Sequence, residues 1–412
     1  MQGTKSYNMS RNITSPTNKY CTGCGACSVN CPVGAIAIAE NLDGFYEPML
    51  DSSKCINCGA CQKVCYKYQS TTELPQLTNK ECFAIHSTNN DTHQSTTSGG
   101  FAYELSRWGV NNGYSIVGVI YDYTINKART IIINDLANLE SLKGSKYIQS
   151  YTEEAFKDII TQAKADIHNR FICIGTPCQI FGLRRLIDSN NIQNEFILVD
   201  LFCHGVPSYL VWDKYIKCQK DRLGQIKNVN FRCKENGWHQ YSIKIIGKKK
   251  TYSNYAYNDI FYRYFFDNVV LNKSCYTCSL RKSSVASDIR IGDFLGGAYE
   301  DREDGISAAV AITEKGARII EKLKSSKYIN IVATHHVSEC LKSQSTEDYP
   351  DIELRDNVIT RLHERDIYQT KRWYIRQFTI KRQIYLRLKS IATLLPYKIL
   401  ITLRRIIRKG RK

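Results

Sequence analysis

Residues 21–32 read CTGCGACSVNCP, and residues 55–65 read CINCGACQKVC. Both stretches have the spacing C-x2-C-x2-C-x3-C, and the second begins 34 residues after the first. Three cysteines spaced by two residues can surround one cubane of iron and sulfide, and the glycines between them let backbone N–H groups approach the sulfur atoms. The repeat therefore predicts two 4Fe-4S clusters near the start of the chain.

The fourth cysteine of each run is expected to cross to the other cluster, as in bacterial two-cluster sequences. One cluster then has the ligands Cys21, Cys24, Cys27 and Cys65, and the other has Cys55, Cys58, Cys61 and Cys31. The intervening residues alternate around Asp43-Gly44, which predicts a hairpin between the cluster loops. Residues 18–68 thus resemble a bacterial two-cluster ferredoxin, although Tyr66 replaces the second proline. A zinc module is the alternative, but its CxxC pairs usually have a longer gap.

The composition is that of a long globular chain. It has 412 residues, 43% of them apolar, which is enough for two or three domains with sizeable cores. The first twenty residues are polar, and no later run approaches the roughly 18 consecutive apolar residues of a membrane span. We therefore expect a cytoplasmic protein. Seventeen cysteines in such a chain indicate metal or redox chemistry rather than a disulfide framework.

The fold class expected from these patterns is α+β, with a small ferredoxin domain, a larger mixed α/β domain and a basic helical tail. The expected segments are a polar N-terminal tail (1–17), the two-cluster domain (18–68), a linker (69–80), the larger domain (81–345) and a basic amphipathic C-terminal region (346–412).

Two stretches of the larger domain run from an apolar strand through a break into a helix. They are FICIGTPCQIFGLRRLI from residue 171 and FILVDLFCHGVPSYLVW from residue 196. This rhythm predicts parallel strands, whose ligands lie outside their carboxyl ends. The residues placed at that edge are Gly175, Thr176, Cys178, Cys203 and His204. Cys173 falls inside its strand and is expected to be a core residue.

A further pair, Cys275 and Cys278, opens the stretch CYTCSLRKSSVASDIRIGDFLGG. A CxxC alone fits a thiol redox pair, half a zinc site or half an iron-sulfur site. With Cys178 and Cys203 it would complete a third 4Fe-4S cluster, and the alternative is four thiols that merely share a pocket. The cysteines without a partner at useful spacing are interpreted as structural thiols: Cys82, Cys218, Cys233 and Cys340.

Residues 96–110, TTSGGFAYELSRWGV, predict a Ser/Gly turn that opens a helix. Such a helix start can bind a phosphate, although a capped helix without a ligand fits the same residues. No G-x-G-x-x-G follows a strand, and the sequence has no Walker loop. A nicotinamide cofactor and nucleotide hydrolysis are therefore not favoured.

Several short motifs occur in a fixed order along the larger domain. They are SGG (98–100), GSKYIQS (144–150), GTPCQIFGL (175–183), FCHGVPS (202–208), FR-x-K-x-x-GW (231–238) and a CxxC that leads to SDIRIGDF (275–294). Together they resemble the beta-subunit family of coenzyme F420 hydrogenases and dehydrogenases, from about residue 81 to 330. The resemblance implies an iron-sulfur flavoprotein in which clusters relay single electrons to FAD, and FAD passes a hydride to an organic acceptor.

The same resemblance implies a set of flavin-site residues. They are Thr97, Ser98, Gly99, Gly100, Lys146, Tyr147, Gly175 and Thr176. His204 is a candidate proton donor, because imidazole titrates near neutral pH, or else a turn histidine bonded to the backbone. Asp293 and Lys146 could equally form ion pairs at the rim of the site.

The C-terminal segment from Lys371 to Lys412 has fourteen Lys or Arg residues and no Asp or Glu. Interleaved aliphatic residues give it an amphipathic helical pattern, which Pro396 interrupts. Three interpretations remain open: contact with an anionic membrane surface, packing on the body of the protein, and binding of nucleic acid. Nucleic acid is disfavoured because the segment has long aliphatic side chains rather than aromatic stacking platforms.

The expected protein is an enzyme, an iron-sulfur and flavin-dependent oxidoreductase with two 4Fe-4S clusters, FAD and a candidate third cluster. Its expected partners are a low-potential electron donor, such as a ferredoxin or a partner redox subunit, and a small-molecule acceptor. It is expected in the cytoplasm, with candidate contact to the inner face of the membrane. The alternatives are a non-catalytic electron-transfer subunit of a larger redox complex and, from the tail alone, a nucleic-acid-binding protein.

Overall fold

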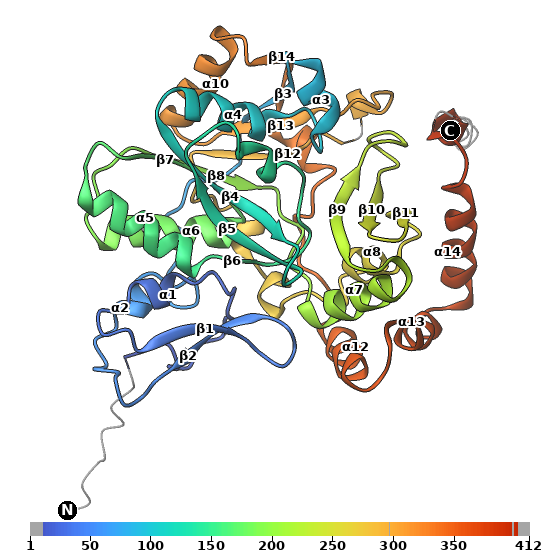
Figure 1. The fold of residues 1–412 in the computed structure, drawn as a ribbon, viewed down its shortest axis with the longest axis horizontal. Helices are drawn as coiled ribbons and strands as arrows, with labels where there is room; N and C mark the ends of the chain where they lie inside the picture. Colours follow the sequence, from blue (N-terminus) through green and yellow to red (C-terminus); the bar gives the residue numbers. More distant parts are fainter. Residues whose placement is uncertain (1–10, 296, 398, 403–412) are drawn as a thin grey trace, which may run out of the picture.

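The structure is a computed structural model that describes residues 11–295, 297–397 and 399–402. The predictions for residues 1–10 of the N-terminal tail and for residues 398 and 403–412 of the basic region therefore lie outside the described residues. Within the described part, the strands form three sheets, and the ferredoxin-like segment lies beneath the largest of them (Figure 1).

The strand bounds are β1 (Ile36–Glu40), β2 (Tyr46–Leu50), β3 (Glu81–Ser87), β4 (Tyr114–Asp122), β5 (Lys127–Ile133), β6 (Ser150–Tyr151), β7 (Arg170–Gly175), β8 (Phe196–Leu201), β9 (Ile226–Cys233), β10 (Ser242–Gly247), β11 (Thr251–Tyr255), β12 (Ile289–Asp293), β13 (Ser307–Ala311) and β14 (Ile329–His336).

The helix bounds are α1 (Ala26–Val29), α2 (Ala60–Lys63), α3 (Asn90–Ser95), α4 (Phe101–Asn111), α5 (Glu153–Ala165), α6 (Pro177–Ser189), α7 (Tyr209–Leu223), α8 (Ile260–Phe266), α9 (Ser279–Lys282), α10 (Glu314–Ser325), α11 (Val337–Leu341), α12 (Ile352–Glu364), α13 (Ile367–Arg376) and α14 (Ile380–Ala392). Short 3-10 turns are η1 (Leu139–Leu142), η2 (Lys273–Cys275) and η3 (Gly297–Tyr299).

The largest sheet has nine strands in the order β14-β3-β13-β12-β8-β7-β4-β5-β6. Strands β12, β8, β7 and β4 are parallel to one another. Strand β3 runs in the same direction as β12, because both are antiparallel to β13. Five strands therefore end at one edge of the sheet, which is the edge where ligands of such sheets bind.

Helices cover both faces of this sheet, as alternating burial along the strands requires. On one face, Ile172 of β7 belongs to the apolar cluster that α4 and α10 complete. On the other face, its neighbours Phe171 and Cys173 pack in the cluster that includes α5 and α6 residues. Cys173 is thus a core residue, as its position inside a strand predicts.

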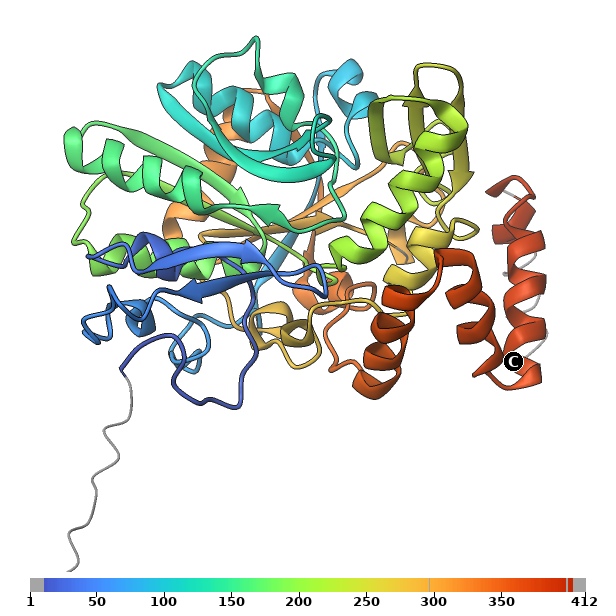
Figure 2. The ribbon, with the colours of Figure 1, turned by 60° about the horizontal axis from the view of Figure 1, so that its bottom comes forward.

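The N-terminal segment forms a hairpin of β1 and β2, in which Ile36 pairs with Leu50 and Glu40 with Tyr46. Short helices α1 and α2 flank the hairpin, and each begins after a cysteine-rich loop. The predicted α+β organisation, with a small cluster domain before a larger mixed domain, is confirmed at this level. Figure 2 shows the hairpin lying along the central sheet, close to α5 and α6.

A smaller antiparallel sheet, in the order β11-β10-β9, packs on α7 and α8 through an aromatic core. Trp212 stacks on Phe231 at 4.9 Å, and both rings contact Phe261. This sheet matters for the site because β9 ends beside the carboxyl edge of β12, where an ion pair joins Arg232 and Asp293.

One buried ion pair fixes two of the parallel strands. Arg290 of β12 donates from Nε and Nη2 to the two carboxylate oxygens of Asp200 in β8, at 2.8 and 2.7 Å. Both side chains are fully buried. Removal of one partner from such a pair leaves an uncompensated charge in the core, which costs about 3–5 kcal/mol.

We predict that Arg290→Leu lowers the melting temperature of the purified protein by roughly 5 °C or more, because Asp200 stays buried without its cation. Differential scanning fluorimetry measures the change. Arg318→Leu is the matched control, since Arg318 pairs with Glu314 at the surface and exposed pairs contribute little. Equal melting temperatures for the two variants would contradict the assignment.

Candidate iron-sulfur sites and the carboxyl edge of the sheet

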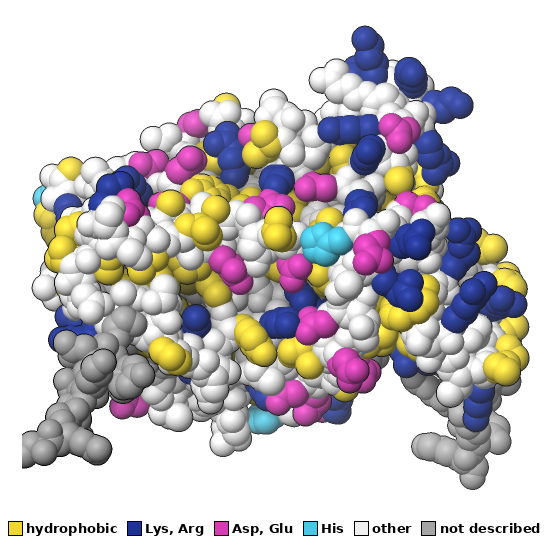
Figure 3. Space-filling view, turned by 90° about the horizontal axis from the view of Figure 1, so that it is seen from below, with side chains coloured by type: hydrophobic (Ala, Val, Ile, Leu, Met, Phe, Trp, Pro, Cys, Tyr) yellow, Lys and Arg dark blue, Asp and Glu magenta, His cyan; other side chains and the backbone are white. Residues whose placement is uncertain are grey.

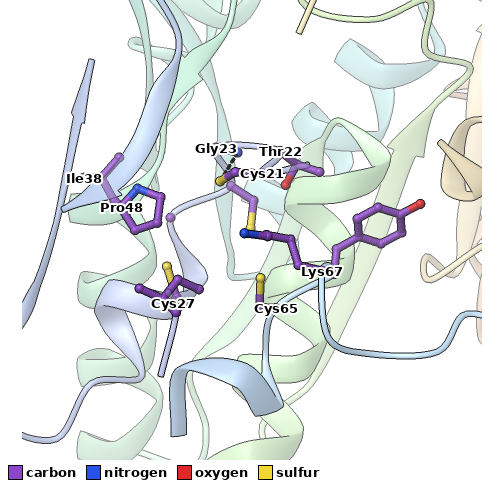
Figure 4. Close-up of a pocket in the computed structure, with 12 residues that line it drawn as sticks. Cys21, Thr22, Gly23, Cys27, Ile38, Pro48, Cys65 and Lys67 are labelled. Atoms are coloured by element: carbon purple, nitrogen blue, oxygen red, sulfur yellow. Dashed lines mark hydrogen bonds between the residues drawn. The ribbon is translucent and has the colours of Figure 1, made fainter. Parts of the chain in front are cut away.

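The first cavity lies in the ferredoxin-like segment and has a volume of about 340 Å³. Four of its lining residues are cysteines: Cys21, Cys24, Cys27 and Cys65. Figure 4 shows the side chains of Cys21, Cys27 and Cys65 gathered around it, and the Gly23 N–H that donates to Cys21 Sγ at 3.3 Å. Cys65 is the residue that the spacing assigns to the first run of cysteines.

The second cavity has a volume of about 290 Å³. Its four cysteines are Cys31, Cys55, Cys58 and Cys61. Cys31 comes from the first run, and its sulfur accepts the Ala35 N–H at 3.2 Å. The two runs thus exchange their fourth cysteines between the cavities, and the role of all eight as cluster ligands stays a prediction.

The thiols around the first cavity lie close enough to influence one another. Burial raises the pKa of Cys21 to about 12, and the neighbouring Cys24 raises it further. Burial likewise raises the pKa of Cys27 well above its usual value, with smaller contributions from Cys24 and Cys65. Cluster assembly requires thiolates, so iron binding must release these protons.

A cluster fits these cavities better than a single ion does. Zinc needs four sulfur atoms at about 2.3 Å from one centre. Among the described residues, no group of three His, Cys, Asp or Glu side chains is placed to hold one metal ion. The backbone is also shaped for close approach at Gly23, whose φ is +69° and where a Cβ would lie 2.6 Å from the Tyr46 carbonyl oxygen.

The first cavity is held against helix α6. A Cβ at Gly182 would lie 3.1 Å from Cys24 Sγ, so glycine is needed for the close approach of the two segments. Thr152 Oγ1 donates to the Cys24 carbonyl oxygen at 2.8 Å, and Gln149 Nε2 donates to the Thr22 carbonyl oxygen at 3.1 Å. These bonds fix the cysteine loop on the larger domain.

A third group of cysteines meets at the carboxyl edge of the large sheet. Cys178 follows β7, Cys203 follows β8, and Cys275 and Cys278 lie in the turn from η2 to α9. Burial raises the pKa of Cys203 to about 12, and Cys275 and Cys278 raise it further. Burial also raises the pKa of Cys178, with Cys278, Cys24 and Cys203 as neighbouring contributors. The structure therefore brings these four thiols together.

Tyr66 lies between the first and third cysteine groups. It follows Cys65 directly, and its hydroxyl is 3.1 Å from Ser279 Oγ and accepts the Ser279 N–H at 3.2 Å. Its ring packs edge-on against Phe181 of α6 at 6.0 Å. Ser279 follows Cys278, so one tyrosine connects the loops that carry both groups.

The predicted flavin-site residues fall into two places. Thr97 Oγ1 accepts the Ser145 N–H at 3.1 Å, so the SGG turn lies beside the GSKY segment. Gly175 and Thr176 lie instead at the end of β7, where Gln179 caps α6. All of them are near the carboxyl edge, and their role in flavin binding stays a prediction.

Lys234 ties the SGG turn to its surroundings. Its ammonium group donates to the carbonyl oxygens of His93, Ser98 and Asp304 at 2.7, 3.0 and 2.7 Å. Burial lowers the pKa of Lys234 to about 8. Sequence reasoning assigned no role to this residue, although it lies within the FR-x-K-x-x-GW motif.

Arg232 of the same motif is the second residue that sequence reasoning did not single out. Its side chain is 5% exposed and pairs with Asp293, and its Nη1 also donates to the Tyr147 hydroxyl at 3.3 Å. The guanidinium group lies 4.4 Å from the Tyr241 ring centroid. Its Nε and Nη2 are buried and have no hydrogen-bond partner within the described part of the chain. Such N–H groups require an acceptor.

Lys146 and His204 have local partners. Lys146 Nζ donates to the carbonyl oxygens of Leu142 and Lys143 at 3.0 and 2.9 Å, which caps η1, and burial lowers its pKa to about 7. His204 has Ser345 Oγ at 3.0 Å from Nδ1 and the Phe265 carbonyl oxygen at 3.3 Å from Nε2. Burial lowers the pKa of His204 to about 4, so the ring is neutral near pH 7. These contacts favour the turn-histidine interpretation, and a catalytic role stays a prediction.

The remaining thiols differ from the expectation in one respect. Cys82 and Cys340 were expected to lack partners, but their thiols hydrogen-bond to each other in the core. The 258 residues between them hide this pairing from sequence spacing, because β3 and α11 meet only in the folded sheet.

Comparisons with known proteins agree with this geometry. Residues 168–336 match the family described as the C terminus of the coenzyme F420 hydrogenase/dehydrogenase beta subunit. Residues 20–67 match the 4Fe-4S dicluster domain. The expected resemblance to these beta subunits, with an N-terminal two-cluster domain, is thereby confirmed. The chain thus carries an iron-sulfur domain joined to a domain of oxidoreductase subunits.

Two individual proteins are similar. One is a subunit of the F(420)H(2) dehydrogenase of Methanosarcina mazei, which is 24% identical over 191 residues that cover 44% of this chain and 53% of that protein. The chain thus spans about half the length of this curated relative. The other is a chain of the F420-reducing NiFe hydrogenase complex from Methanosarcina barkeri. It has a TM-score of 0.44 and 14% identity, and the likeness covers 74% of this chain and 96% of that chain.

The search for membrane-spanning helices had a negative result: within the described residues, none is both long and apolar enough to cross a bilayer.

We predict that Cys65→Ala removes about four irons per chain, because one cubane loses a ligand and its cavity opens. Iron and acid-labile sulfide are measured after anaerobic purification. Cys173→Ala is the control, since Cys173 is a buried thiol of the sheet core. An unchanged iron content in the Cys65 variant would refute its assignment as a ligand.

Proposed function

We propose that this protein is an iron-sulfur flavoprotein oxidoreductase that relays single electrons through its clusters to FAD and reduces a small organic acceptor. One observation carries the proposal. The third cysteine group lies at the carboxyl edge of the parallel strands, and its Cys178 is one helical turn along α6 from Gly182, which contacts Cys24. One turn of helix rises about 5.4 Å, so the first and third groups are neighbours.

The proposed order of electron transfer follows from these contacts. The second cavity lies at the far end of the ferredoxin-like segment, the first contacts α6, and the third occupies the sheet edge. In this scheme, Cys178, Cys203, Cys275 and Cys278 hold a third 4Fe-4S cluster. Tyr66 and Ser279 connect the loops of the first and third groups and keep their separation constant.

The flavin-site proposal rests on the residues beside this edge. The SGG turn, Tyr147 and Arg232 surround the end of β12, and Arg232 has two buried N–H groups that require an acceptor. Oxygen or nitrogen acceptors of FAD would satisfy them. Bound FAD supplies the step from one-electron to two-electron chemistry. Lys234 would hold the turn in place through its three carbonyl contacts.

The proposed partners are a low-potential donor, such as a ferredoxin or a partner redox subunit, and a small organic acceptor. F420 or a related compound is one candidate acceptor, since the name of the curated relative contains it. We propose the cytoplasm as the location. The seventeen cysteines are free thiols, and a reducing compartment keeps them so.

A non-catalytic electron-transfer subunit is the second candidate function. The curated relative is named as a subunit of a dehydrogenase, which favours this role. Such a protein would carry the clusters of residues 20–67 but would reduce no small molecule alone. Turnover by the isolated chain distinguishes the two functions.

The test combines composition with turnover on anaerobically purified protein. We expect about twelve irons and one flavin per chain, and flavin-dependent oxidation of a reduced artificial donor in the presence of an organic acceptor. In Cys278→Ala, iron falls to about eight while the ferredoxin clusters remain. About eight irons in both proteins would remove the third cluster. Lack of flavin even after reconstitution with FAD would favour the electron-transfer subunit.

We also predict that Lys234→Met weakens FAD binding by about tenfold or more, because three carbonyl groups around the SGG turn lose their shared donor. Fluorescence titration of the flavin-free protein with FAD measures the dissociation constant. Lys322→Met is the control, since Lys322 is exposed on α10. The iron content should not change in either variant, and equal FAD affinities would show that the turn does not contribute to the flavin site.

A further inference from the structure

The basic C-terminal region has two parts that differ in packing. Helix α13 is anchored in the body: Tyr374 is fully buried and donates to Asp267 Oδ2 at 2.5 Å, and the Ile367 carbonyl oxygen accepts the Tyr264 hydroxyl at 2.8 Å. Helix α14 follows without burying any of its thirteen residues in the described structure. Packing on the body therefore explains α13 but leaves α14 unexplained.

Helix α14 turns its polar side toward the body. Ser390 Oγ donates to Asn258 Oδ1 at 2.6 Å, and Asn258 Nδ2 donates to Thr393 Oγ1 at 3.0 Å. Lys389 Nζ lies 4.3 Å from the Tyr257 ring centroid. A surface helix of a globular protein normally places its apolar stripe against the core. Here the orientation is reversed.

The opposite side of α14 and the turn after it carry a continuous aliphatic stripe. Its members recur at intervals of three or four residues: Ile380, Ile384, Leu388, Ile391 and Leu395. Ile380 is 76% exposed, Leu388 62% and Ile391 64%. Figure 1 shows α14 as the outermost element on its side of the molecule. Five large aliphatic side chains in one row leave much apolar surface in water, which is unfavourable without a partner.

Basic side chains border the aliphatic stripe. Lys381 and Arg387 are exposed on α14, and no Asp or Glu occurs between residues 371 and 412. Figure 3 shows Lys and Arg side chains beside hydrophobic ones over the C-terminal helices, at the right of the view. The partner of this surface must therefore be apolar in its interior and negatively charged at its border.

We propose that the aliphatic stripe of α14 lies in the interface of an anionic lipid bilayer, with Lys381 and Arg387 at the headgroups. A helix with an apolar face, a basic border and too short a length to span the bilayer adopts this arrangement. Anionic headgroups attract Lys and Arg near the membrane surface, and the acyl chains cover the aliphatic side chains. The body of the protein then stays outside the membrane, attached through Asn258 and α13.

A second copy of the chain fits this surface less well. Two such helices face to face would bring two sets of positive charges together without any acidic residue from their own segments. Nucleic acid would satisfy the charges but not the aliphatic stripe, which has no row of aromatic rings for base stacking. Both remain measurable outcomes.

The test uses the full chain, purified anaerobically with its clusters, and lipid vesicles that sediment or float. One set contains phosphatidylcholine with phosphatidylglycerol, and the other contains phosphatidylcholine alone. Wild-type protein should bind the anionic set, with affinity that falls as salt rises. The double variant Ile384→Ser with Leu388→Ser should bind about tenfold more weakly or less, since two large side chains lose their burial in lipid.

The matched control is Ile125→Ser with Ile167→Ser, because both residues are also more than half exposed but lie on the body. This control should bind like the wild type, and all proteins should keep the same iron content. Equal binding by the α14 variant and the wild type would overturn the proposal, as would no binding of the wild type to anionic vesicles. Concentration-dependent dimers that the α14 variant abolishes would assign the stripe to a second copy instead.

Discussion

Helix α6 approaches the Cys24 loop so closely that residue 182 has no room for a side chain. This contact determines how far the ferredoxin-like segment stands from the central sheet. Because Cys178 lies one turn away on the same helix, the contact also sets the distance between two cysteine groups. Thr152, Gln149 and Tyr66 hold the same arrangement from three sides through hydrogen bonds. The small domain is therefore part of a continuous body rather than a tethered module.

The sequence contained enough information for the parts of the structure that depend on local spacing. The two cysteine runs predicted a hairpin with flanking loops, and the apolar stretches at 171 and 196 predicted adjacent parallel strands. The carboxyl-edge rule then grouped Cys178 with Cys203, because parallel neighbours end at the same edge. None of these inferences required a long-range contact to be known in advance.

The remaining features depend on contacts between distant segments. Arg232 meets Asp293 only because the β9–β11 sheet packs beside β12, and Lys234 reaches residues 93, 98 and 304 across three loops. Cys82 and Cys340 pair for the same reason. The direction of α14 also could not be derived from its periodicity, since an amphipathic pattern defines a stripe but not what the stripe faces.

The three carbonyl contacts of Lys234 have a consequence for motion. One ammonium group satisfies the chain at positions 93, 98 and 304 together, so these segments cannot loosen one at a time without leaving the buried cation short of an acceptor. Opening of this edge should therefore be cooperative, with the SGG turn and the segment before β13 moving as a single unit. The edge would then have two states, open and closed, with few intermediates between them.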